Sequence, residues 1–252
     1  MKDRLHKIRS SRIGLALSGG SVRGLAHIGV IKALAESGIR PSVIAGTSAG
    51  SLIGAAVAAG LDWPGLADMA RSVFWPSLLN GERLERFCAE HLPETFKELR
   101  LPFAAVATSI PSKQPVSITQ GRLATAISAS CALRLIRRPV LREGERLKDG
   151  GIACVLPAQA CRDLGAEFVI GSDVWEVSSL LRSVGLSPAR PGSERFYPSH
   201  YRQALGHTDL LIHPKIPRVG YLPGAKAIEH MIAAGQKAAH RALSFSNYND
   251  AG

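Results

Sequence analysis

The residues best suited to chemistry in this chain surround Ser48, in the stretch VIAGTSAGSLIGAA. The pattern G-x-S-x-G is formed here by Gly46, Thr47, Ser48, Ala49 and Gly50. Such a pattern presents a serine hydroxyl when it turns sharply from a strand into a helix, and an apolar strand-like run and a small-residue helical run flank it here. The sequence therefore predicts a nucleophilic serine, with a helix-capping serine in a plain tight turn as the alternative.

A second glycine cluster, SGGSVRG at residues 18–24, also lies between a strand-like and a helical run. It is not a complete dinucleotide fingerprint, because Ser21 stands where a glycine is needed, and no G-K-[S/T] makes it a P-loop. Its exposed amides at a helix start could still bind an anion. If Ser48 attacks an ester, that anion would be the tetrahedral oxyanion.

A serine nucleophile also needs a base. None of the eight histidines lies in a motif that identifies it as catalytic. His200, His207 and His213 come late enough for a Ser…Asp…His order, so a conventional triad remains an alternative. Asp149, in LKDGG, precedes two glycines, and a carboxylate on such a turn can approach another loop closely. A simple turn at Asp149 is the competing interpretation.

The length of the chain is enough for one large α/β domain, with two small domains as the alternative. The chain has 252 residues, with 31 lysines and arginines against 20 acidic residues, a formal net charge of +11. That charge favours nucleic acid, acidic lipid headgroups or an anionic substrate. Only 6% of residues are aromatic, so a base-stacking surface for nucleic acid is not expected. The four cysteines form no disulfide framework, and no metal or cofactor constellation is present in the sequence.

The termini and hydropathy give the expected boundaries and location. We expect a basic tail at 1–12, a single domain at 13–245 and a short tail at 246–252. The basic tail is either solvated or an electrostatic tether to an anionic bilayer. No signal-peptide core follows it, and no run approaches the ~18 apolar residues of a transmembrane helix. These features predict a cytoplasmic protein, with peripheral contact at the inner face of a membrane as a further expectation.

Strands and helices are expected to alternate along the chain. The expected strands are 13–17, 42–45, 103–108, 115–119, 167–174 and 209–214. The expected helices are 25–36, 51–60, 123–133, 158–165 and 224–243, with broken helices over 61–100 and loops over 134–157 and 183–200. This order predicts a three-layer α/β/α fold with a mostly parallel sheet. Both glycine clusters would then lie at the carboxyl ends of strands, where such sheets bind ligands.

Three motifs together point to a family. GGSVRGLAHIGV, AGTSAGSLIGA and KDGG, in that order, resemble the patatin-like phospholipase family, in particular its bacterial members. GAEFVIGSDV and the segment from TDLLIHPKIP to GQKAA resemble later parts of the same family. The resemblance implies a serine lipid acyl hydrolase of the phospholipase A, lysophospholipase or esterase type. It implies no metal and no cofactor, and a lipid or acyl ester as the substrate.

The resemblance also implies roles for particular residues. Ser48 would be the nucleophile and Asp149 the base, without a histidine, and an acyl-enzyme would be hydrolysed by water that Asp149 activates. The Asp149 turn would be completed by Gly150 and Gly151. The oxyanion hole would be formed by Gly19, Gly20, Ser21, Arg23 and Gly24. For Arg23, a role in locking this loop through hydrogen bonds is preferred to direct substrate contact.

Departures from the family pattern raise alternatives. Ser21 replaces the third glycine of G-G-G-x-R-G, and RLIRRP replaces Pro-Gly-x-Phe-x-Pro. Arg134, Arg137 and Arg138 in that segment are predicted either to contact anionic headgroups or to be plain surface charge. A catalytically inactive relative that binds anionic membranes, and a basic α/β protein that binds nucleotide or nucleic acid, are the alternative functions. The acyl substrate, acyl transfer to acceptors other than water, and the oligomeric state stay open.

Overall fold

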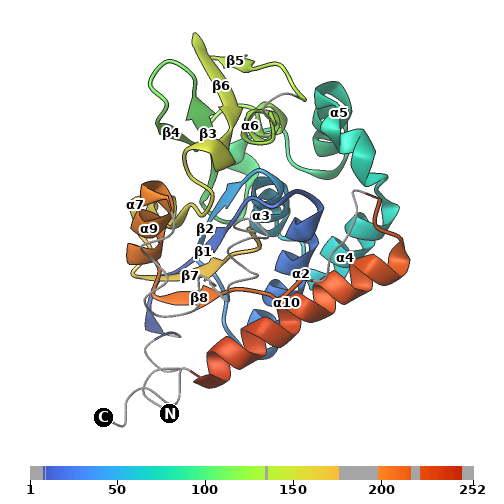
Figure 1. Ribbon diagram of the computed structural model, residues 1–252, viewed down its shortest axis with the longest axis vertical. Coiled ribbons are helices and arrows are strands. Elements are labelled where there is room, and N and C mark those ends of the chain that lie inside the picture. The colour runs from blue at the N-terminus through green and yellow to red at the C-terminus, as the bar shows by residue number, and fades with distance from the viewer. Residues whose placement is uncertain (1–7, 9, 134–135, 176–197, 217–221, 246–252) are drawn as a thin grey trace.

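A mixed sheet forms the centre of the molecule (Figure 1) in a computed structural model that describes residues 8, 10–133, 136–175, 198–216 and 222–245. The parallel strands are β1 (Ile13–Leu17), β2 (Val43–Thr47), β3 (Phe103–Ser109), β7 (Phe168–Ser172) and β8 (Leu210–Ile212). They run in the order β3-β2-β1-β7-β8, and antiparallel strands continue the sheet from β3. The antiparallel strands are β4 (Pro115–Ile118), β5 (Val140–Arg142) and β6 (Glu145–Asp149). The predicted α/β class with a mostly parallel sheet is confirmed.

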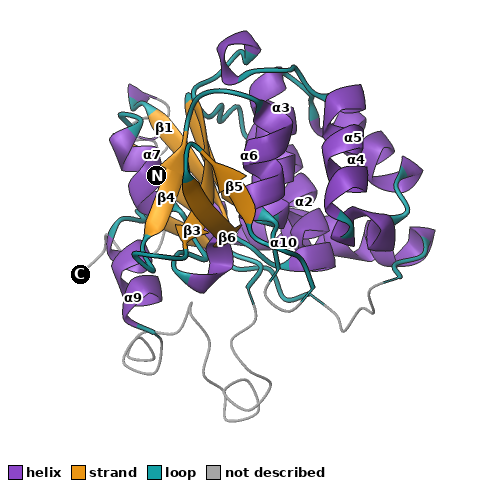
Figure 2. Ribbon diagram, turned by 90° about the horizontal axis from the view of Figure 1, so that it is seen from above, coloured by secondary structure: helices purple, strands orange, loops and turns teal. Residues whose placement is uncertain are grey.

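The central strands are continuous apolar runs because both faces of the sheet are covered. Every residue of β1, β2, β3 and β7 is buried. One face carries α2 (Ala26–Glu36), α3 (Ala49–Ala59), α4 (Trp63–Ser72), α5 (Gly81–His91), α6 (Leu123–Ser130) and α10 (Ala225–Phe245). The other face carries α7 (Ala158–Asp163) and α9 (Ser199–Gly206), as Figure 2 shows. The three layers are therefore unequal in thickness.

The register of β3 explains how the chain brings its antiparallel strands to the centre. β4 pairs with residues 105–108 of β3, overlapping both the residues that pair with β2 and those that pair with β6. Because a strand has two edges, β2 and β6 must share one edge of β3, end to end. Thr47 pairs with Val106 and Asp149 pairs with Ala107, the next residue. The last residue of β6 therefore adjoins the last residue of β2.

Two expected loops contain regular structure. Within 134–157, predicted as a loop, β5 and β6 form a hairpin across Glu143 and Gly144, whose φ angles are 51° and 80°. The charged sequence of this hairpin obscures its strands. Helix α9 begins at the end of the predicted 183–200 loop, and the rest of that loop lies outside the described residues.

The chain ends were predicted as tails. Ile8, within the predicted basic tail, is fully buried in the core, so packed structure begins before residue 13. Arg134, residues 246–252 and most of the basic tail lie outside the described residues.

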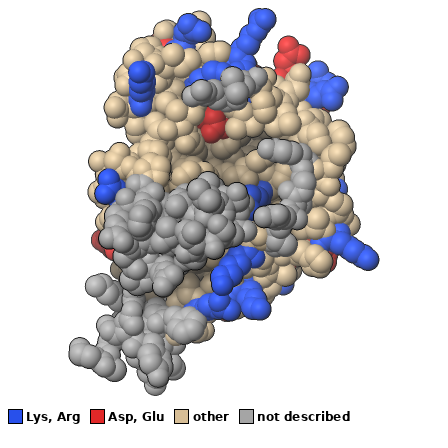
Figure 3. Space-filling model, viewed as in Figure 1, with Lys and Arg blue, Asp and Glu red and all other residues tan. Residues whose placement is uncertain are grey.

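The surface carries the basic excess of the composition. Lysine and arginine side chains outnumber acidic ones on the face drawn in Figure 3. Across the part of the chain that the structure describes, no helix is both long and apolar enough to cross a bilayer. Nor do three or more histidine, cysteine or acidic side chains gather there as they would around a metal ion.

Candidate active site

Ser48 occupies a strained turn between β2 and α3. Its φ and ψ angles are 52° and −123°, a left-handed backbone that costs a non-glycine residue about 1–3 kcal/mol. A Cβ on Gly46 would lie 2.2 Å from the Gly50 carbonyl oxygen, and a Cβ on Gly50 would lie 2.3 Å from that of Leu17. The two glycines therefore let the turn close on itself and against the end of β1. Ser48 remains 7% exposed.

Ser130, at the end of α6, braces this turn from a distant part of the chain. The Ser48 amide donates to Ser130 Oγ at 2.8 Å, and Ser130 Oγ donates to the Val106 carbonyl at 2.6 Å. The Ser51 hydroxyl donates to the Ser48 carbonyl at 2.7 Å. Ser130 was not predicted, because a serine in a helix of small and apolar residues belongs to no recognisable motif.

Asp149 reaches the same place from β6. Its Oδ1 accepts the Gly151 amide at 2.9 Å, whereas its buried Oδ2 has no hydrogen-bond partner of ordinary geometry among the described residues. Burial raises the pKa of Asp149, and the Ser48 hydroxyl, the Gly151 amide and the charge of Arg137 partly offset that rise. Asp149 thus combines a raised pKa with one oxygen that has no hydrogen-bond partner among the described residues, and its carboxyl group lies near the Ser48 hydroxyl.

The turn after Asp149 is held tightly against β3. A Cβ on Gly150 would lie 2.1 Å from the Val106 carbonyl oxygen, so only glycine fits. The Thr108 hydroxyl donates to the Asp149 carbonyl at 2.8 Å and accepts the Ala153 amide at 3.2 Å. Thr108, like Ser130, is a supporting residue that no sequence motif indicated.

The first glycine loop lies between β1 and the short helix η1 (Ser21–Leu25). The Gly19 amide donates to the Val155 carbonyl at 2.9 Å, which corrects its predicted role, because that N–H is not free for an oxyanion. The structure gives the amides of Gly20 and Ser21 no acceptor among the described residues. Ser21 has φ 53°, the conformation for which glycine would be the ordinary choice.

Arg23 and Gly24 hold this loop in place. Arg23 Nε donates to the Val174 carbonyl at 2.9 Å, a contact of the locking kind preferred for it from the sequence. A Cβ on Gly24 would lie 2.7 Å from the Ala49 Cβ. Gly24 therefore lets η1 pack against the start of α3, next to Ser48.

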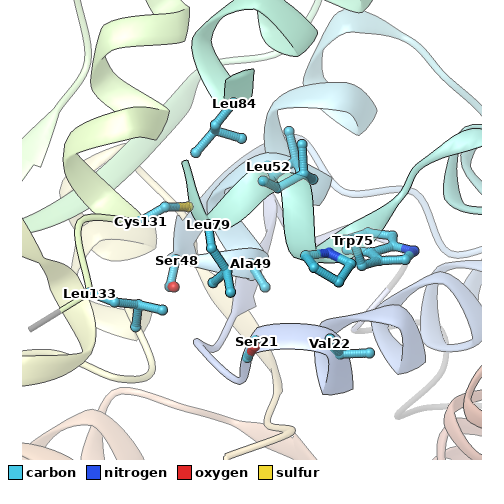
Figure 4. A pocket seen from close by; sticks show the side chains of 12 residues that line it. Ser21, Val22, Ser48, Ala49, Leu52, Trp75, Leu79, Leu84, Cys131 and Leu133 are labelled. Atoms are coloured by element: carbon cyan, nitrogen blue, oxygen red, sulfur yellow. The ribbon is translucent and has the colours of Figure 1, made fainter. Parts of the chain in front are cut away.

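An apolar pocket opens in front of Ser48 (Figure 4). Its walls come from η1, the first turns of α3, the helix η2 (Trp75–Leu79), α5 and the chain after α6. The lining side chains besides Ser48 are Ser21, Val22, Ala49, Leu52, Trp75, Pro76, Leu78, Leu79, Leu84, Cys131 and Leu133. Most are aliphatic or aromatic, so the pocket suits a hydrocarbon chain better than a polar group.

The three histidines considered for a triad lie elsewhere. His213 Nδ1 is 3.2 Å from Oδ2 of Asp173, while His200 and His207 line a different pocket, together with residues 152–154 of the segment after Asp149. None of the three lines the pocket of Ser48.

Arg137 and Arg138, two of the arginines that depart from the family pattern, have different surroundings. The Arg137 guanidinium folds back to donate to the carbonyls of Ser128 and Cys131 at 3.1 and 3.2 Å, and to Ser128 Oγ at 2.7 Å. It thereby satisfies carbonyls near the end of α6. Arg138 is exposed, and Arg134 lies outside the described residues. A headgroup contact by these arginines stays a prediction.

Comparison with known proteins completes the description. A family model described as patatin-like phospholipase matches residues 15–162. The chain is 31% identical over 182 residues to lysophospholipase nte1 of Aspergillus fumigatus, covering 66% of this chain and 12% of the fungal protein. It is 34% identical over 174 residues to an uncharacterized NTE family protein of Mycobacterium bovis, covering 64% of this chain and 48% of that protein. It therefore spans less than half of either relative.

One solved structure extends the comparison to the fold. VipD from Legionella pneumophila aligns with a TM-score of 0.65 and 15% identity, over 93% of this chain and 67% of VipD. At that identity the likeness concerns the fold alone.

Proposed function

The chain belongs to the patatin-like phospholipase family, and from this premise we propose that it is a serine lipid acyl hydrolase. Ser48 is the nucleophile and Asp149 the general base, and the reaction passes through an acyl-enzyme. The proposal requires no histidine in the proton transfer, no metal and no cofactor.

One observation carries this proposal. The buried Oδ2 of Asp149 lacks a hydrogen-bond partner among the described residues, yet the Ser48 hydroxyl lies near enough to lower the pKa of Asp149. A buried polar atom without a partner is costly, and such atoms concentrate where function requires them. A carboxylate oxygen kept free beside a strained serine supports proton abstraction from that serine.

The reaction follows from these positions. Oδ2 takes the Ser48 proton as Oγ bonds to the ester carbonyl carbon, and the oxyanion is held by the free amides of Gly20 and Ser21 with that of Ala49. Collapse of the tetrahedral intermediate breaks the bond to the alcohol, which leaves with the proton from Asp149. Water then gives a proton to Asp149 and attacks the acyl carbon. The carboxylic acid departs, and the proton returns to Ser48.

The pocket and the surface charge support a lipid substrate. The aliphatic lining in front of Ser48 suits an acyl chain, and the net charge of +11 favours anionic headgroups or an anionic membrane surface. The fungal relative is named a lysophospholipase, so lysophospholipid is the first substrate class to try.

A hydrolysis assay tests this function. Wild-type protein should release fatty acid from lysophosphatidylcholine or from a fluorogenic acyl ester, and Ser48→Ala should abolish that release. Ser72→Ala is the matched control, because Ser72 does not line the pocket and its hydroxyl donates to the Met69 carbonyl within α4. If a folded wild type releases no acid while binding anionic vesicles, the inactive lipid-binding alternative would replace this proposal.

A further inference from the structure

A buried histidine, His27, lies behind the loop that carries the free amides. It is in the first turn of α2, it is fully buried, and no step of the proposed reaction uses it. Its Nε2 is 3.0 Å from the Ser18 carbonyl oxygen, and its Nδ1 is 2.7 Å from Ser172 Oγ.

The partners of His27 determine its tautomer. A carbonyl oxygen only accepts hydrogen bonds, so Nε2 carries the proton and Nδ1 accepts from the Ser172 hydroxyl. Burial lowers the pKa of His27 to about 4, against smaller opposing effects of the Ser18 carbonyl and the Asp173 charge. The ring is therefore neutral at neutral pH and is held in one orientation.

These contacts act on a single peptide plane. The carbonyl oxygen of Ser18 and the amide nitrogen of Gly19 belong to the same peptide group, which is planar. His27 holds its oxygen, and the Val155 carbonyl accepts its N–H at 2.9 Å. Both ends of this plane are thus fixed immediately before Gly20 and Ser21.

The same stretch is tied to β7 and to the residues that follow it. The Ser18 amide donates to the Ser172 carbonyl at 3.0 Å, and the Val174 amide donates to Ser18 Oγ at 2.8 Å. His27 bridges the same two serines from the side of α2. Removal of the ring would leave the Ser18 carbonyl buried without its donor, which favours a rotation of the peptide.

We propose that His27 is a positioning residue which fixes the Ser18–Gly19 peptide plane and thereby aims the Gly20 and Ser21 amides at the oxyanion. This role rests on the proposed hydrolase function. It acts on the transition state, because the oxyanion exists only after Ser48 attacks. Loss of His27 should therefore lower kcat and leave KM nearly unchanged.

Two isosteric variants test the role of the ring. Gln in His27→Gln places its N–H near the position of Nε2, whereas the shorter amide in His27→Asn reaches only the Nδ1 side. His27→Asn should lower kcat about 10–100-fold with KM within about twofold, since one oxyanion donor is worth about 10²–10³. His27→Gln should recover most of that loss. The melting temperature of both variants is measured as well.

The outcomes separate the two proposals. An active wild type whose folded His27→Asn variant keeps the wild-type kcat would overturn the positioning role alone. The positioning role would also be overturned if His27→Asn and His27→Gln lose the same fraction of kcat and that loss tracks the fall in their melting temperatures. If Ser48→Ala retains full hydrolysis, the proposed function itself fails. If His27→Asn does not fold, Ser172→Ala is used in its place. We expect a smaller loss of kcat in Ser172→Ala, and an unchanged kcat would contradict the positioning role of His27.

Discussion

Two buried aspartates at the ends of different strands of the sheet behave in opposite ways. Asp149 ends β6 and Asp173 directly follows β7, with exposed fractions of 6% and 0%. Asp173 is fully partnered: Oδ1 accepts the Trp175 amide at 2.9 Å, and Oδ2 receives the Tyr201 hydroxyl and lies 3.2 Å from His213 Nδ1. Asp149 keeps one oxygen free.

The hydrogen-bond partners, more than burial, set the two pKa values apart. Burial raises the pKa of both carboxyls. At Asp173 the effects of His213, Tyr201 and the Trp175 amide outweigh burial, so its pKa is lowered. At Asp149 burial prevails, so its pKa is raised. A partnered carboxylate stabilises the fold, whereas one with a free oxygen is available to take a proton.

The largest expected effect is on activity at Asp149. Asp149→Asn should reduce kcat about 10⁴-fold, because the amide cannot take the Ser48 proton. Its melting temperature should stay the same or rise by about 2–4 °C, since about 1 kcal/mol of buried-charge cost is removed. Steady-state kinetics and calorimetry measure both. A variant that keeps a tenth of the wild-type kcat would remove Asp149 from the mechanism.

Asp173 should show the opposite profile. Asp173→Asn breaks a buried charged network and should cost about 3 kcal/mol of unfolding free energy. That corresponds to a fall of about 6–12 °C in melting temperature. The kcat of its folded form should fall far less than that of Asp149→Asn. An unchanged melting temperature would show that the partners of Asp173 do not stabilise the fold.

The pH dependence separates the two carboxyls. Asp149 must be ionised to act, and its pKa is raised, so kcat should fall with acid at a pH above the ordinary aspartate range. Asp173 has a lowered folded pKa, so its stabilising contribution is complete above the ordinary aspartate pKa and is lost progressively as the pH falls from there through the lowered folded value. Activity should therefore disappear at a higher pH than folded structure. Coincident loss in rate and circular dichroism would contradict this order.

The smallest expected effect is at Ser21, whose amide, but not its side chain, takes part in the proposed reaction. Ser21→Gly relieves the strain of φ 53° and should change stability by no more than about 1 kcal/mol. Hydrolysis should persist at close to the wild-type rate, because the Ser21 amide is retained. Loss of activity in a folded Ser21→Gly protein would assign a function to the Ser21 hydroxyl.

The sequence predicts those parts of the site that depend on local backbone geometry. At Gly46, Gly50 and Gly150 an added Cβ would lie less than 2.5 Å from a backbone oxygen, so glycine is required there. A requirement for glycine at fixed positions can be recognised in a sequence motif. The supports from Ser130 and Thr108 come from distant segments and ordinary residue types, so no local signal reveals them. The same reason explains why the bond from Gly19 to Val155 was not foreseen.

The missed hairpin had a readable signal. A two-residue turn with positive φ at both positions is typical of hairpins, and Glu143-Gly144 lies between the short runs VLR and ERLKD. The charged composition, which is concentrated in the ERLKD sequence of β6, favoured a loop. The hairpin matters for function, because its strand β6 ends at Asp149 and places this residue beside Ser48.

Covalent labelling of Ser48 tests the central claim most directly. Purified wild type, Ser48→Ala, Asp149→Asn and Asp173→Asn would be treated with a fluorescent fluorophosphonate, and the modified peptide identified by mass spectrometry. We predict a single adduct on Ser48, absent in Ser48→Ala, far slower in Asp149→Asn and near the wild-type rate in folded Asp173→Asn. An adduct on another residue, or Asp149→Asn labelling as fast as wild type, would contradict the assignment of Ser48 and Asp149 as the reacting pair.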